Sequence, residues 1–298
     1  MDTTVKNLPN EYYIHQLKSS HRLCYQLFGD IQGYPLLYCH GFPASRLEAG
    51  LAHQAASTLG ACIVAVDRPG FGRSDFQPGR QMRDWVELSR GLMDALGHER
   101  FSVIGISGGT PYAMLLGEHL HQRIYRLGIV GGLGDLSTPG SEQSMGLAQR
   151  SMVRLARSYP QLALWLNRYP AAALVRRFPT TVLKILLGRA PAVDRIELAK
   201  PATSQIILDS IREAFVHGGR GPAWDFYLAT GHWQADPAAI KVDTFLWHGC
   251  LDTTVPVSMG RRHTQLIPRC HAEFLENEGH FSLPLKHISR IISQLLPQ

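Results

Sequence analysis

The 298-residue chain is poor in cysteine, and its five cysteines, Cys24, Cys39, Cys62, Cys250 and Cys270, form no CxxC pair. An odd number at wide spacings indicates neither a disulfide framework nor a cysteine-based zinc site. Cys39 and Cys62 lie in apolar runs typical of strands, so we expect both to be buried. No apolar run reaches the ~18 residues of a membrane span, and the N-terminal segment lacks the apolar stretch of a signal peptide. These absences predict a cytoplasmic protein for which membrane association is disfavoured.

The chain also lacks a lysine- and arginine-rich run, although its formal net charge is +6. The excess is local, because residues 136–222 hold twelve Lys/Arg and only five Asp/Glu. No nucleic-acid partner is therefore expected. Within this basic segment, Arg150, Arg154 and Arg157 share one face of an expected helix at 147–158. A solvated face is favoured, with attraction of an anionic substrate or a membrane surface as alternatives.

Apolar runs without alternation recur along the chain and are typical of parallel strands covered on both faces. They occupy residues 22–29, 34–41, 61–70, 101–107, 126–132 and 244–249. Helical patterns separate them, as at 82–97, where apolar residues recur at spacings of three and four. This alternation predicts an α/β sheet with right-handed crossovers.

The rhythm changes between about 137 and 222. Short helical pieces are expected there, cut by Pro160, Pro170, Pro179 and Pro191, because proline breaks the hydrogen-bond ladder of a helix. The simplest interpretation is a helical insertion between two strands of the sheet. Its residues Trp165, Leu166, Phe178 and Leu183 are expected either in the core of this insertion or along a pocket.

The stretch VIGISGGTPYA, residues 103–113, places a Gly-x-Ser-x-Gly motif between an apolar run and a helical segment. Such a tight strand-to-helix turn exposes its serine and needs neighbours without side chains, here Gly105 and Gly109. Pro111 suits the first turn of the helix. The sequence therefore predicts that Ser107 is a catalytic nucleophile.

A serine hydroxyl needs a base, and the base needs an orienting group. His280 and Asp252 each follow an expected strand, so both belong at the carboxyl-terminal edge of the sheet. The chain order Ser107, Asp252, His280 is the one expected for this architecture. Asp135, which follows the preceding strand, is a weaker alternative for the acid.

The loop HGFPASR, residues 40–46, can supply one donor of an oxyanion hole. Pro43 has no N–H, so the expected donors are the N–H groups of Phe42 and Gly108.

Five blocks, HGFPASR, DRPGFGRSD, GISGGTPYA, HGCLDTTVP and EGHFSL, lie in this order between residues 35 and 283. In this the chain resembles a serine hydrolase of the α/β-hydrolase superfamily with a helical cap. The resemblance implies an eight-stranded, mostly parallel sheet with helices on both faces. The change of pattern along the chain gives the boundaries: residues 1–136 and 223–298 for this core and 137–222 for the cap (lid). It also implies an acyl-enzyme mechanism on a small-molecule ester or related acyl bond, as in a carboxylesterase, with no cofactor and no metal. The chain departs from many relatives at Gly108, which is expected to leave room beside the nucleophile.

Other polar residues receive structural interpretations. His40 and His248 precede glycines at strand ends and are expected to order loops. His119 and His121 point to different faces of a helix, so a shared metal is not expected. Asp67 and Arg68 are expected to brace loops, together with Arg46, for which a substrate contact is the alternative.

Other functions remain open from the sequence, among them a cofactor-independent perhydrolase or dioxygenase, for which the chain carries no distinguishing motif. A proline-iminopeptidase-like aminopeptidase would share the fold and triad but needs carboxylates for the substrate's amino group, and the basic insertion argues against it. A ligand-binding receptor on the same fold is not excluded by an intact triad. Haloalkane dehalogenases and epoxide hydrolases are disfavoured, because those relatives carry Asp where this chain has Ser107. The oligomeric state is not determined by the sequence.

Overall fold

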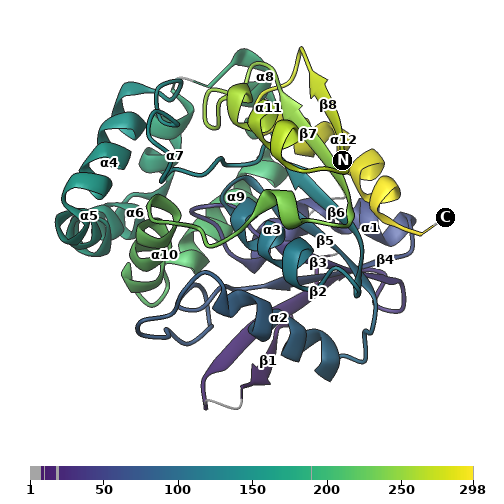
Figure 1. The fold of residues 1–298 in the computed structure, drawn as a ribbon. Coiled ribbons are helices and arrows are strands. Elements are labelled where there is room, and N and C mark those ends of the chain that lie inside the picture. The colour runs from purple at the N-terminus through teal and green to yellow at the C-terminus, as the bar shows by residue number, and fades with distance from the viewer. Residues whose placement is uncertain (1–7, 10, 18–19, 189, 298) are drawn as a thin grey trace.

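The computed structural model describes residues 8–9, 11–17, 20–188 and 190–297. Eight strands form one sheet in the order β1-β2-β4-β3-β5-β6-β7-β8 (Figure 1). Strands β1 and β2 are antiparallel to their neighbours, and every pairing from β4 through β8 is parallel. The strands are β1 Tyr13–Gln16, β2 Arg22–Gly29, β3 Tyr34–Cys39, β4 Ala61–Val66, β5 Phe101–Ile106, β6 Ile124–Val130, β7 Asp243–Gly249 and β8 Cys270–Leu275. The predicted mostly parallel eight-stranded sheet is confirmed.

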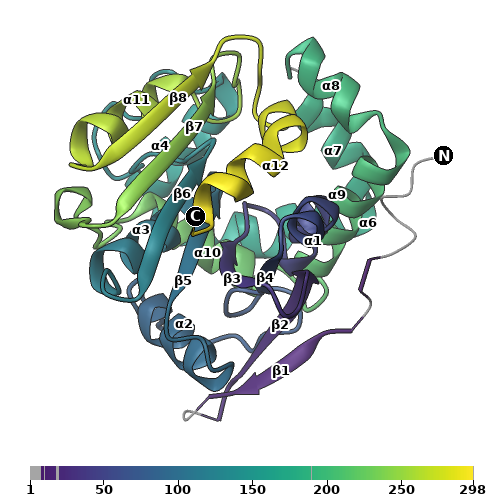
Figure 2. The ribbon, with the colours of Figure 1, turned by 90° about the vertical axis from the view of Figure 1, so that its right-hand side faces the viewer.

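Helices cover both faces of this sheet, which explains why its strands are apolar without alternation. Leu36 and Leu37 are adjacent in β3 and both fully buried, yet they belong to different core clusters on opposite faces. One face packs against α2 Asp84–Ala95, α3 Thr110–His119 and α11 Val257–Leu266, and the other against α1 His53–Thr58 and α12 Ser282–Leu295. Figure 2 shows this sheet between its β1 and β8 edges. Short 3-10 turns, η1 Arg46–Ala52, η2 Ser107–Gly109 and η4 Pro237–Ala239, complete this part of the fold.

A run of helices lies between β6 and β7, here called the inserted helices. They are α4 Leu147–Ser158, α5 Pro160–Leu166, η3 Asn167–Ala171, α6 Ala172–Arg177, α7 Pro179–Leu187, α8 Ala192–Leu198, α9 Pro201–Ala214 and α10 Arg220–Thr230. Figure 1 shows α4 to α7 gathered to one side of the sheet. Helix α10 runs across residue 222, so the boundary expected there falls inside a helix.

Three of the four prolines interrupt the inserted helices as predicted. Pro160 and Pro179 open α5 and α7, where a missing N–H costs nothing, and Pro191 is the N-cap of α8. The prediction was wrong for Pro170, which lies inside the π-helical turn η3 that joins α5 to α6 without a break. A π-turn widens the helix locally, and this relieves the clash that a proline ring makes with the preceding turn.

Apolar side chains of the inserted helices divide between core and surface. Leu183 joins a buried cluster that also contains Phe71 of the sheet-forming part of the chain. Trp165 and Phe178 instead remain about half exposed, so neither belongs to that core. Within the described residues, no helix is long and apolar enough to cross a membrane.

Candidate active site

Ser107 lies at the carboxyl end of β5 and opens the 3-10 turn that leads into α3. Its φ angle is +51°, a conformation that residues other than glycine rarely adopt and that is characteristic of a strained, functional turn. The two motif glycines are required, because a Cβ on Gly105 would lie 2.6 Å from the Cβ of Ala113 and one on Gly109 would lie 2.0 Å from the Cys39 carbonyl oxygen. The turn therefore forms as the motif predicts.

His280 and Asp252 meet Ser107 from two other strand ends. His280, between β8 and α12, places Nε2 at 3.0 Å from the Ser107 Oγ, and its Nδ1 lies 2.6 Å from the Asp252 Oδ2. All three side chains are buried. A hydroxyl, an imidazole and a carboxylate thus form one hydrogen-bonded chain, the arrangement that allows a serine to lose its proton as it attacks.

Asp252 is held by its own loop. Its Oδ1 accepts the backbone N–H groups of Thr254 at 2.8 Å and Val255 at 2.7 Å, which leaves Oδ2 for the imidazole. The Val255 carbonyl oxygen lies 2.9 Å from Nε2 of the fully buried His248, so this histidine orders the loop as expected. Asp135, the alternative acid, instead accepts the N–H and hydroxyl of Ser137.

The surroundings of His280 favour its protonated form. Burial lowers the pKa of this imidazole, but the charge and hydrogen bond of Asp252, followed by the charges of Asp194 and Glu48, raise the pKa above its usual value. A raised pKa makes the imidazole a stronger proton acceptor, as a general base requires.

The backbone at Phe42 lies against the backbone at Gly108. A Cβ on Gly108 would be only 2.8 Å from the Phe42 Cβ and 3.3 Å from the Phe42 nitrogen. The expectation that Gly108 leaves room beside the nucleophile is therefore wrong, because Phe42 fills that space. The two amides expected to bind an oxyanion are neighbours.

Buried polar groups hold the loop that carries Phe42. The Gly41 N–H donates to Glu48 at 2.8 Å, and Arg68 donates to the carbonyl oxygens of His40 and Gly41. His40 Nδ1 lies 2.9 Å from the Gly41 carbonyl oxygen, and burial lowers the pKa of His40 well below its usual value, so its ring is a neutral partner. His40 and Arg68 thus order this loop, as the sequence predicted.

Asp225 of α10 is a residue that the sequence reasoning missed. Its carboxylate accepts Arg68 at 3.0 and 3.2 Å, Arg80 at 2.6 Å and the Tyr112 hydroxyl, and it is almost completely buried. Burial acts to raise the pKa of Asp225, but the two guanidinium charges outweigh it and lower the pKa. The only sequence signal was a single acid in the otherwise uncharged stretch AWDFYLATGHW.

A second ion-pair group links η1 to α9. Arg46 binds Asp67 at 2.6 Å and Glu213 at 2.7 Å, and Glu213 also accepts Arg73 at 3.1 Å. Asp67 and Arg46 thus brace the loops as expected, and Glu213 of the inserted helices is a further partner of Arg46.

Two of the three arginines of α4, Arg154 and Arg157, do more than form a solvated face. Arg157 donates to the carbonyl oxygens of Leu136 and Thr138 and to Glu142, which also accepts Arg154. Hydrogen bonding by the Glu142 backbone and by both arginines outweighs its burial and lowers the pKa of Glu142 to about 2. These contacts tie α4 to the segment that leaves the sheet.

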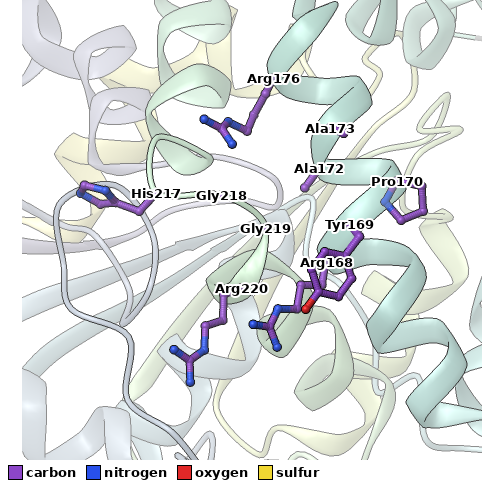
Figure 3. Close-up of a pocket in the computed structure, with 10 residues that line it drawn as sticks. All are labelled: Arg168, Tyr169, Pro170, Ala172, Ala173, Arg176, His217, Gly218, Gly219 and Arg220. Carbon is purple, nitrogen blue, oxygen red and sulfur yellow. The ribbon is translucent and has the colours of Figure 1, made fainter.

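Unpaired positive charge gathers elsewhere on the inserted helices. Arg168, Arg176, His217 and Arg220 line an open cavity of about 610 Å³ (Figure 3). Within the described part of the chain, none of its three arginines forms an ion pair with a carboxylate. All four side chains are exposed, so the cavity is a solvated basic surface.

Comparisons with known proteins bear on the family and the fold. The family model described as alpha/beta hydrolase fold matches residues 34–286. The 2-hydroxymuconate semialdehyde hydrolase of Pseudomonas putida is 25% identical over 265 residues, 87% of this chain and 84% of that protein. An esterase from Exiguobacterium antarcticum superposes with a TM-score of 0.71 at 16% identity, covering 96% of this chain and 99% of the esterase. The enol-lactonase from Burkholderia xenovorans LB400 gives a TM-score of 0.68 at 18% identity, with 96% and 100% covered.

The chain belongs to the alpha/beta hydrolase fold family, since the family model spans most of its length. Together with the hydrolase relatives, this membership identifies an enzyme of the alpha/beta-hydrolase type. The two solved structures, at 16% and 18% identity, show that this chain shares their fold.

Proposed function

We propose that this enzyme hydrolyses a carboxylic ester, or a related acyl bond such as a thioester or amide, through an acyl-enzyme on Ser107. The observation that carries the proposal is the hydrogen-bonded chain from Ser107 through His280 to Asp252. Each member follows a different strand of the sheet, so a rigid framework sets their distances. The names of two structural neighbours, an esterase and an enol-lactonase, favour the same bond class.

In the first half-reaction, the Ser107 Oγ attacks the carbonyl carbon while its proton passes to His280 Nε2. Asp252 keeps the proton of Nδ1 in place and stabilises the imidazolium that forms. The bond to the leaving group then breaks, and His280 gives its proton to the departing oxygen, sulfur or nitrogen. In the second half-reaction, water loses a proton to His280 and attacks the acyl carbon, and the proton returns to Ser107 as the acid leaves.

The N–H groups of Phe42 and Gly108 are assigned to the oxyanion of each tetrahedral intermediate. Such donors are effective because the loop is fixed before the charge develops. Here Glu48 and Arg68 fix the loop by binding Gly41 and the carbonyl oxygens beside it.

The inserted helices are assigned the role of a cap that covers this site and shapes the small-molecule pocket. Their carboxylates bear on the choice of substrate. All five acids of residues 136–222 have partners: Glu142 with Arg154 and Arg157, Glu197 with Lys200, Asp209 with Arg212, Glu213 with Arg46 and Arg73, and Asp194 with backbone N–H groups. A substrate's amino terminus would have to displace one of them, so an aminopeptidase function is disfavoured.

The test begins with a fluorophosphonate probe, which reacts with an activated serine. We expect the wild type to be labelled, Ser107→Ala to be unlabelled, and Ser144→Ala, which removes an exposed hydroxyl, to be labelled as the wild type. A series of p-nitrophenyl esters of increasing acyl length then measures the size of the acyl pocket. An enol lactone and 2-hydroxymuconate semialdehyde complete the panel, because relatives carry those names.

Full esterase activity in the Ser107→Ala variant would overturn the mechanism. Cleavage of proline-terminated fluorogenic amides without ester turnover would instead favour the aminopeptidase. Tight, saturable ligand binding by a folded protein with negligible turnover would favour a receptor.

A further inference from the structure

One carboxylate of the inserted helices is bound by the loop that carries His280. Asp194 of α8 is 1% exposed and accepts three consecutive backbone N–H groups: His280 at 2.9 Å, Phe281 at 3.1 Å and Ser282 at 2.8 Å. The Oδ2 atom of Asp194 accepts the N–H of His280, and Oδ1 accepts the other two. The carboxylate is thus committed entirely to this loop.

The binding has a clear physical basis. The three N–H groups lie at the start of α12, where a helix has no internal partners for its first donors. Phe281 is the N-cap of α12 and makes no side-chain capping bond. Asp194 therefore caps this helix from 86 residues earlier in the chain, and its negative charge is favourable at a helix N-terminus.

Gly279 is a second, independent sign of this contact. A Cβ at this position would lie 2.4 Å from both carboxylate oxygens of Asp194. The residue before His280 is therefore restricted to one without a side chain by the carboxylate from α8.

We propose that Asp194 is a positioning residue, through which the inserted helices hold His280 in line with Ser107 and Asp252. The idea rests on the proposed function of that triad. Ser107 and Asp252 are set by the sheet and its loops, whereas the backbone of His280 is held by a group outside the sheet. The catalytic geometry is then complete only while α8 is docked.

Removing the Asp194 charge has an effect that a purely structural contact would not have. The charged groups around His280 are Asp252, Asp194 and Glu48, and all three favour its protonated form. The other titratable neighbour is His248, 3.5 Å from the Asp252 carboxylate, and burial lowers the pKa of His248 below its usual value. Asp194→Asn keeps the shape of the side chain and loses the charge. The acid limb of the pH profile of kcat/KM should therefore move to lower pH, because the imidazole loses its proton more readily.

The experiment compares Asp194→Asn and Gly279→Ala with Asp209→Asn, an exposed carboxylate of α9 that pairs with Arg212. We expect Asp194→Asn to lower kcat by about 10- to 100-fold, the cost of a small misplacement of a catalytic group, with KM little changed. Gly279→Ala should lower kcat in the same way, and it provides the test if Asp194→Asn fails to fold. Asp209→Asn should match the wild type in kcat and pH profile.

Hydrogen exchange at the amides of residues 280–282 provides a readout that needs no turnover. We expect faster exchange there in Asp194→Asn and Gly279→Ala than in the wild type. Folded variants with wild-type kcat, pH profile and exchange would overturn the proposal. If the wild type itself neither turned over esters nor reacted with the probe, the proposed function would fail, and exchange would still decide whether Asp194 holds the loop.

Discussion

Asp225→Asn tests the buried ion-pair group formed by Asp225, Arg68 and Arg80. The substitution preserves shape but removes the negative charge that balances two guanidinium groups, whose side chains are 0% and 2% exposed. Arg68 would retain its bonds to backbone carbonyl oxygens, while Arg80 would retain chiefly the Tyr112 hydroxyl at 3.3 Å. Breaking a buried pair by removing one partner costs about 3–5 kcal/mol, because the remaining charge stays buried without compensation.

Urea unfolding followed by tryptophan fluorescence and by circular dichroism measures this loss. We expect the free energy of unfolding to fall by about 3–5 kcal/mol with an unchanged dependence on denaturant. The matched control is Asp75→Asn, which breaks a pair with Arg22 whose side chains are 31% and 57% exposed, so about 0–1 kcal/mol should be lost. If Asp225→Asn cost no more than the control, the two arginines would not depend on Asp225, and the reasoning would be refuted.

Three further predictions concern activity. The acid limb of the pH profile of kcat/KM should have a midpoint above the usual imidazole pKa. The reason is that the pKa of His280 is raised and only the neutral ring accepts the Ser107 proton. A measured midpoint below the usual value would contradict this prediction. Gly108→Ala should lower kcat by about 10- to 100-fold, since the new Cβ would lie 2.8 Å from that of Phe42, and unchanged ester hydrolysis would show that the loop yields freely. Asp252→Asn should lower kcat by about 10³- to 10⁴-fold, whereas Asp135→Asn should leave it near the wild type; the reverse result would exchange their assignments.

The sheet could be predicted from the sequence because strands buried on both faces have a simple signature. Uninterrupted apolar runs marked β3, β4 and β5, and the motif around Ser107 placed the strand-to-helix turn. The meeting of Asp252 and His280 with Ser107 followed from the rule that parallel strands end at one edge of a sheet. The short, mostly exposed strand β1 lacked that signature and was missed.

The contacts between the inserted helices and the rest of the chain could not be predicted in this way. No local pattern indicates that Asp194 binds the amides near His280, because the two are 86 residues apart along the chain. The same holds for Asp225, which is 157 residues from Arg68 and 145 from Arg80. The prediction that Pro170 ends a helix was wrong for a related reason. Proline usually ends a helix, but here the chain widens into a π-turn and continues.

Three acids in and next to the basic segment attach the inserted helices to the sheet-forming part of the chain. Asp194, Glu213 and Asp225 come from α8, α9 and α10, and each binds a loop of the sheet-forming part at a different point of the candidate site. They bind, respectively, the backbone N–H groups at His280, Arg46 after the loop that carries Phe42, and Arg68, which donates to two carbonyl oxygens of that loop. These carboxylates bind the sheet-forming part, and the three arginines that line the cavity of Figure 3 form no ion pair with a carboxylate of the described residues. Because Asp194, Glu213 and Asp225 link the inserted helices to loops of the sheet-forming part, a change that undocks these helices should disturb the candidate site before it disturbs the sheet.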